Sequence, residues 1–174
     1  MTPGKVLAAG LAASLAAVLA ASAQAQLRPM VYVETTVERS TDEAFADWTT
    51  DARVEAFFAP QATIEAVPGG RYRLCFAPDA PQGSCGNDDG RILALQPGHM
   101  LAFTWAMPPY MPEIRPHLTS VQILFEPVDA DTTRVRLFHT GFGSGEAWRE
   151  GRAYFAQTWP AVLEAYREDV ASGS

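Results

Sequence analysis

Residues 146–170 read EAWREGRAYFAQTWPAVLEAYREDV, and this stretch decides the fold of the 174-residue chain. Large apolar side chains recur in it every three or four positions with charged residues between them, which is the pattern of an amphipathic helix. These side chains are Trp148, Phe155, Trp159, Val162, Tyr166 and Val170. Pro160 has no amide hydrogen to donate, so a kink or a restart of the helix is expected near Thr158. One long helix is therefore predicted, with an apolar side that another part of the chain must cover.

The residues before this helix alternate apolar and polar side chains, which is typical of strands with one face buried and the other in water. In the last of these strands Val135, Leu137 and His139 share one face. A sheet with one apolar face needs a cover, and the C-terminal helix is the only expected element long enough to serve. The strands are expected at residues 30–38, 72–76, 91–95, 100–106, 118–126 and 132–140.

Two short helices are expected after the first strand. The sequence Ser40-Thr41-Asp42-Glu43 predicts a helix start, because a hydroxyl can accept from the free amides there and acids suit the positive end of the helix dipole. A second helix is expected to begin at Thr50 or Asp51 and to end before Pro60. The fold class that follows is α+β, a curved antiparallel sheet of about six to seven strands around a long C-terminal helix.

The first 25 residues have the composition of a secretory signal. They contain ten alanines, no acid and a single base, Lys5, which precedes an apolar run and the small-residue site Ala23-Gln24-Ala25. Residues 1–25 are therefore predicted to be a cleaved signal peptide, with a periplasmic or secreted location and no stable membrane insertion after cleavage. The remaining chain has twelve arginines against twenty acids, a net charge of −8. Such a charge repels phosphate groups, so nucleic acid is not expected as a partner.

Cys75 and Cys85 are the only cysteines of the chain. In an exported protein such a pair is expected to form a disulfide, which would contribute roughly 2–3 kcal/mol by closing a short loop. The alternative is a reactive or metal-binding pair, which would need a base or further ligands close by. His99 is the nearest histidine in the sequence.

Several short sequences, in this order and at this spacing, resemble one known family. They are residues 44–60 with FFAP at 57–60, PGGRY at 68–72, GRIL at 90–93, LAFTW at 101–105 and TRVRLFHTGF at 133–142. The chain resembles the homologues of the activator of the heat-shock protein 90 ATPase, in the START-like (SRPBCC, helix-grip) superfamily. The resemblance runs from about residue 31 to 167, so residues 30–171 are expected to form one START-like domain. The insertion at residues 78–89 departs from the family pattern.

The resemblance implies a cavity between the sheet and the C-terminal helix, which the superfamily commonly uses for apolar ligands. The same side chains could instead fill a solid core, because bulky rings fill space as readily as they line it. The side chains expected to line such a cavity are Phe57, Phe58, Tyr72, Leu74, Phe76, Phe103, Trp105, Ile123, Phe125, His139, Phe155 and Trp159.

Three functional hypotheses follow, and the first is favoured. The domain binds a small hydrophobic ligand in this cavity; it is an enzyme of cyclase or hydratase type with His139 as the acid–base group; or it binds a protein partner, by analogy with the chaperone activator. The founding activator is cytosolic, so the resemblance to it implies the fold rather than that activity. No cofactor and no metal site are expected, because Met107, Met111 and His117 offer copper ligands without a regular spacing.

Overall fold

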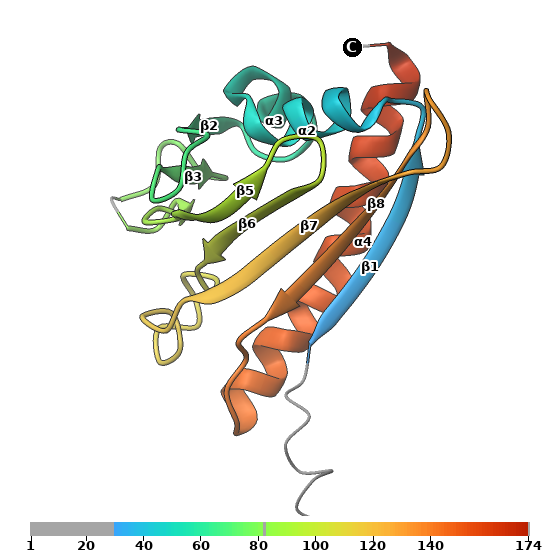
Figure 1. Cartoon of the computed structure of the whole chain (residues 1–174). Helices are drawn as coiled ribbons and strands as arrows, with labels where there is room; N and C mark the ends of the chain where they lie inside the picture. The colour runs from blue at the N-terminus through green and yellow to red at the C-terminus, as the bar shows by residue number, and fades with distance from the viewer. Residues whose placement is uncertain (1–29, 82, 174) are drawn as a thin grey trace, which may run out of the picture.

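The computed structural model describes residues 30–81 and 83–173, and the expected signal peptide, residues 1–25, lies outside them. Its main sheet is antiparallel and five-stranded (Figure 1). Across this sheet the order is β1 (Val31–Val37), β8 (Thr133–Thr140), β7 (Thr119–Pro127), β6 (Met100–Trp105) and β5 (Ile92–Gln96). β7 and β8 pair in a register that sets Val121 opposite His139, so the apolar residues of both strands fall on the same face.

The helix α4 (Glu146–Ser172) covers that face, as the sequence predicts. Figure 1 shows it lying along one side of the curved sheet, with the two short helices at one end. Its buried side consists of Gly151, Phe155, Trp159, Leu163, Tyr166 and Val170. Pro160 lies inside a continuous helix, so the alternative of a restart near Thr158 is not what the structure shows. The Thr158 hydroxyl donates to the Tyr154 carbonyl at 2.9 Å, one turn earlier.

The remaining strands form a second, three-stranded sheet in the order β2 (Gln61–Ile64), β3 (Tyr72–Cys75) and β4 (Gly86–Asn87). The sequence predicted β3 as part of one larger sheet and gave no sign of β2. Between the two sheets the strand ladder is reduced to a single bridge, from Arg71 to Arg91. The buried Asn87 side chain joins them instead, because its amide donates to the Tyr72 carbonyl at 2.9 Å and to the Thr104 carbonyl at 3.0 Å.

The two short helices, α2 (Thr41–Thr49) and α3 (Asp51–Phe57), lie where the sequence predicts them. α2 begins with a capping box, in which the Ser40 side chain accepts from the Glu43 amide and the Glu43 carboxylate accepts from the Ser40 amide. These hydrogen bonds from Ser40 lower the pKa of Glu43 below its ordinary value. The helix start is thus fixed by its own first turn.

A buried carboxylate joins the short helices to α4. Asp47 accepts hydrogen bonds from the Tyr166 hydroxyl at 3.0 Å and from Arg53 Nε at 2.7 Å. Arg53 also reaches Asp169 on α4 at 3.0 Å. Because every charged member has a partner of opposite charge, the cluster can remain inside the protein.

In the part of the chain that the structure describes, no helix combines the length and the apolar character that crossing a bilayer requires.

Candidate functional site

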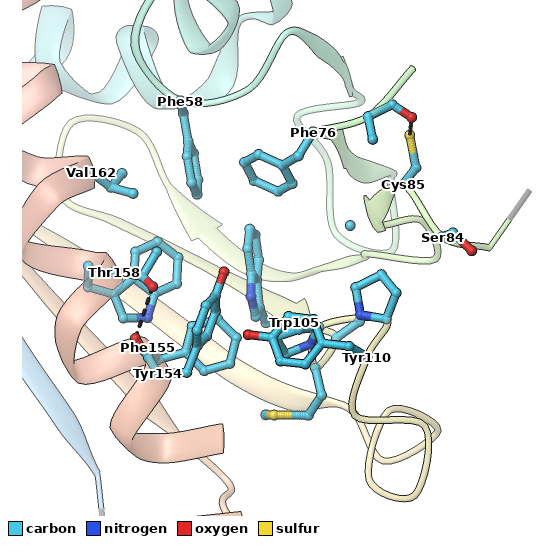
Figure 2. A pocket seen from close by; sticks show the side chains of 17 residues that line it. Phe58, Phe76, Ser84, Cys85, Trp105, Tyr110, Tyr154, Phe155, Thr158 and Val162 are labelled. Atoms are coloured by element: carbon cyan, nitrogen blue, oxygen red, sulfur yellow. Dashed lines mark hydrogen bonds between the residues drawn. The ribbon is translucent and has the colours of Figure 1, made fainter. Parts of the chain in front are cut away.

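A cavity of about 450 Å³ opens between α4, the end of β6, the residue that follows α3, and two loops (Figure 2). The first loop contains the disulfide, and the second is the proline-rich segment after β6. No side chain that lines the cavity carries a charge. The lining residues are Phe58, Phe76, Ala77, Ser84, Cys85, Gly86, Trp105, Ala106, Met107, Pro108, Pro109, Tyr110, Tyr154, Phe155, Thr158, Trp159 and Val162.

Four aromatic side chains in mutual contact form the inner wall. The Phe58 and Trp105 rings are nearly parallel, 5° apart, with centroids 5.6 Å from each other. Phe76 meets Phe58 edge-on at 5.6 Å, and Trp159 approaches Trp105 at 5.2 Å with a tilt of 56°. Such contacts lie within the range in which aromatic pairs attract beyond simple burial. The wall is therefore a set of rings that support one another from four segments of the chain.

Phe76 reaches the cavity because strand β3 ends one residue earlier, at Cys75. The alternation of the sequence predicted Phe76 within the strand, on its covered face. In the structure 43% of the surface of Phe76 is exposed, and the residue borders the cavity. Its ring lies directly over Gly86, where a Cβ atom would approach the ring within 2.4 Å. Only a glycine fits at that position, so the short strand β4 serves as the support on which Phe76 rests.

The loop beside Phe76 is held by the predicted disulfide between Cys75 and Cys85, whose Cα atoms are 4.6 Å apart. Asp88 supports the same loop, since its carboxylate accepts from the amides of Cys85 at 3.1 Å and Gly86 at 3.3 Å. The covalent bond and the two hydrogen bonds act on adjacent residues of the lining. The disulfide and these hydrogen bonds therefore restrain this side of the cavity.

Arg115 joins the disulfide loop to the proline-rich loop. Its guanidinium donates to the carbonyls of Gly83 at 2.8 Å and Gly86 at 2.9 Å, and pairs with Asp88 at 3.1 Å. It also donates to the Met107 carbonyl at the start of the other loop. Because one side chain satisfies acceptors on both loops, the distance between the two sides of the opening depends on Arg115.

Two tyrosines form the outer rim, and neither was predicted from the sequence as a lining residue. Tyr110, in the proline-rich loop, is 65% exposed, and Tyr154, on α4, is 38% exposed. Their rings meet edge-on with centroids 6.0 Å apart. Partial burial, together with the neighbouring Tyr154, raises the pKa of Tyr110, so its hydroxyl stays protonated at neutral pH. Tyr154 immediately precedes Phe155 and so falls beside the buried stripe of the helix.

His139 is buried and lies outside the lining of the cavity. Its Nδ1 accepts from the indole N–H of Trp159 at 3.0 Å, which leaves the proton of the neutral ring on Nε2. Nε2 then donates to the Thr119 hydroxyl at 2.7 Å, and that hydroxyl donates to the Trp105 carbonyl at 2.9 Å. Burial lowers the pKa of His139 to about 3, so the ring is neutral at physiological pH. The chain of hydrogen bonds connects the two tryptophans of the cavity wall.

The structure divides the predicted lining residues into two groups. Phe58, Phe76, Trp105, Phe155 and Trp159 border the cavity. The other group lies outside its lining, and most of its members pack in the core. These are Phe57, Tyr72, Leu74, Phe103, Ile123, Phe125 and His139. The role of either group in binding stays a prediction.

The packing in the second group explains the division. The Tyr72 ring stacks on Phe103 with centroids 4.0 Å apart, and its hydroxyl donates to the Trp48 carbonyl at 3.1 Å. Near the short helices, therefore, the space between sheet and α4 is filled by side chains.

The methionines of the proline-rich loop pack on α4. A Cβ atom at Gly151 would lie 3.0 Å from the Met107 sulfur and 3.7 Å from the Met111 sulfur, so both side chains depend on the absence of a side chain there. Ile114 fills the space beside them at 3.2 Å from the same point. Among residues 30–81 and 83–173, no three His, Cys, Asp or Glu side chains gather closely enough to hold a metal ion.

A long helix held by a curved antiparallel sheet, with a cavity between them, defines the helix-grip class of proteins. The family model described as activator of Hsp90 ATPase homolog 1-like protein matches residues 38–168. The chain belongs to this family. No curated protein matches the sequence.

Solved structures share the fold at low sequence identity. Protein MLL2253 from Mesorhizobium loti is 18% identical with a TM-score of 0.68, over 84% of this chain and 99% of that one. The Aha1 dimer from Colwellia psychrerythraea is 17% identical with a TM-score of 0.63, over 82% of this chain and 96% of that one. DynU16, from the dynemicin biosynthetic locus, is 17% identical with a TM-score of 0.62, over 83% of this chain and 48% of that one. At such identities the likeness shows the fold alone.

Proposed function

We propose that this protein is an exported carrier or sensor that binds one small apolar molecule in the cavity between α4, β6 and the two loops. The observation that carries the proposal is a cavity of about 450 Å³ with seven aromatic side chains and no charged side chain in its lining. Cavities of this size and composition are typical of sites for small organic ligands. A small molecule that fills the space between these rings would remove their apolar surface from water.

The rim supports this proposal because contacts within the chain itself hold its shape. The disulfide holds one loop, and Arg115 fixes the distance between that loop and its neighbour. Asn87 adds a third tie, since its side-chain oxygen accepts from the Ala106 amide at 3.0 Å. A site ordered in advance loses less conformational entropy when it binds.

Export is part of the proposal and rests on two features. Residues 1–25 have the three parts of a secretory signal, and both cysteines of the chain are joined in a disulfide. Disulfides persist mainly in oxidising compartments such as the periplasm or the cell exterior. The Hsp90-related role in the family description therefore does not transfer readily to this chain.

The surroundings of His139 favour binding over catalysis. A general acid or base must reach the reacting molecule, and its pKa should lie near the working pH. His139 lies outside the lining, contacts Thr119 and Trp159 through its two nitrogens, and has its pKa lowered to about 3 by burial. We assign it a positioning role, in which it holds the tryptophans of the wall in place.

The test uses Nile red, a neutral apolar dye whose fluorescence rises in apolar surroundings. The mature protein is expected to bind one dye molecule per chain. The variant Val162→Trp places a large side chain into the lining and should abolish this binding, whereas Val128→Trp, at an exposed site outside the lining, should leave it unchanged. Absence of dye binding to the wild type, or equal binding by both variants, would overturn the proposal.

A further inference from the structure

The lining contains no charge that could neutralise a charged ligand. Among the described residues that border the cavity there is no Asp, Glu, Lys, Arg or His. Arg115 supports the rim, but its guanidinium already serves the carbonyls of Gly83, Gly86 and Met107 and the carboxylate of Asp88. An unpaired carboxylate or ammonium group buried here would lose its hydration without a counter-charge. The ligand that fits this interior is neutral.

The walls favour a flat molecule over a flexible chain. The Phe58 ring, at the end of α3, and the Trp105 ring, on β6, lie within 5° of parallel; on α4 the Phe155 and Trp159 rings lie within 25°. The two pairs converge, since Trp105 and Trp159 are tilted by 56° at 5.2 Å. A planar ring system can stack on one pair and meet the other edge-on, both of which are favourable geometries. A flexible alkyl chain would gain only the burial of its apolar surface, without these ring contacts.

The mouth offers two polar groups that the protein itself does not use. Neither the Tyr110 hydroxyl nor the Tyr154 hydroxyl hydrogen-bonds another residue within the described part of the chain, although both residues line the cavity. Figure 2 shows both phenol oxygens turned toward the space beside Trp105. Each hydroxyl can donate one hydrogen bond and accept others. The centroids of the two tyrosine rings are 6.0 Å apart, so the two hydroxyls can converge on one oxygen atom of a ligand.

We infer that the cavity selects a neutral, planar aromatic molecule carrying a carbonyl or hydroxyl oxygen, and that Tyr110 and Tyr154 determine this specificity by hydrogen-bonding that oxygen at the mouth. The inference rests on the proposed function, because it names the class of ligand for the same cavity. Phe58, Trp105 and Trp159 hold the rings of the ligand, and the two phenols fix which edge faces outward. The volume of about 450 Å³ accommodates a system of several fused rings.

The experiment compares four probes by their displacement of Nile red. Fluorenone and fluorene have the same fused-ring frame and differ in one carbonyl oxygen; 9-oxofluorene-2-carboxylate adds a negative charge, and 1-dodecanol is neutral but flexible. In the double variant Tyr110→Phe/Tyr154→Phe, the affinity for fluorenone should fall roughly fivefold for each hydrogen bond lost, while that for fluorene should not change. Tyr32→Phe, on the outer face of β1, is the matched control and should change neither affinity.

The wild type should bind fluorenone at least tenfold more tightly than the carboxylate and than dodecanol. Equal affinities for fluorenone in the wild type and the double variant would overturn the inference, as would tighter binding of the carboxylate or of dodecanol. An outcome that overturns the inference in this way leaves the proposed function intact, provided that Nile red still binds. If neither Nile red nor any probe binds, the proposed function fails and the inference fails with it.

Discussion

Acid should destabilise this protein through His139. Its pKa is lowered by burial to about 3, against the ordinary value of 6.5 that applies in the unfolded chain. Below pH 6.5 the unfolded chain therefore takes up a proton that the folded protein does not. The stability contributed by the neutral ring is fully present above pH 6.5 and is lost as the pH falls toward 3. The loss approaches about 1.4 kcal/mol for each pH unit, which gives roughly 2 kcal/mol between pH 6.5 and 4.5.

The assay is urea unfolding at a series of pH values for the wild type and for His139→Gln, which removes the titrating ring. Other groups also titrate in this range, so the quantity of interest is the difference between the two slopes. Below pH 6 the wild type should lose stability more steeply than His139→Gln by about 1.4 kcal/mol per pH unit. His99→Gln, at an exposed histidine, is the matched substitution for comparison. Parallel curves for the wild type and His139→Gln would refute the proposed burial and hydrogen bonding of this ring.

Three further predictions concern the frame around the cavity. Asp47→Ala removes the acceptor for Tyr166 and should lower the free energy of unfolding by roughly 1–3 kcal/mol, measured by urea denaturation; no change would contradict the buried network. Replacing Cys75 and Cys85 by serine should lower it by about 2–3 kcal/mol, and a reducing agent should then have no further effect. Arg115→Met should speed amide exchange in residues 83–86 and weaken Nile red binding; unchanged exchange would mean that the loops hold without it.

Much of the fold could be predicted because it follows from local patterns. The spacing of Phe155, Trp159 and Tyr166 fixes the buried side of α4, and the Ser40 and Glu43 pair fixes the start of α2. These features depend on residues a few positions apart, and the structure confirms them. Strand β2 and the division into two sheets were not predicted, because they depend on how distant segments bend toward each other.

The site was only partly predictable, because alternation tells which face a side chain occupies but not whether the space opposite is filled. Phe103 and Trp105 are two residues apart on the same face of β6. Phe103 is covered by Tyr72 at 4.0 Å, whereas Trp105 faces the cavity. Tyr110 was missed since a proline-rich loop has no periodicity from which its direction could be inferred. Which residues end at the cavity is decided by tertiary packing.

Native mass spectrometry of the protein, purified from its own host without a denaturing step, tests most directly whether the cavity holds a molecule. The wild type should carry one small neutral adduct per chain, and Val162→Trp, prepared in the same way, should show the mass of the bare chain. A wild type that is bare, and that also fails to bind Nile red, would contradict a ligand-binding role for this domain.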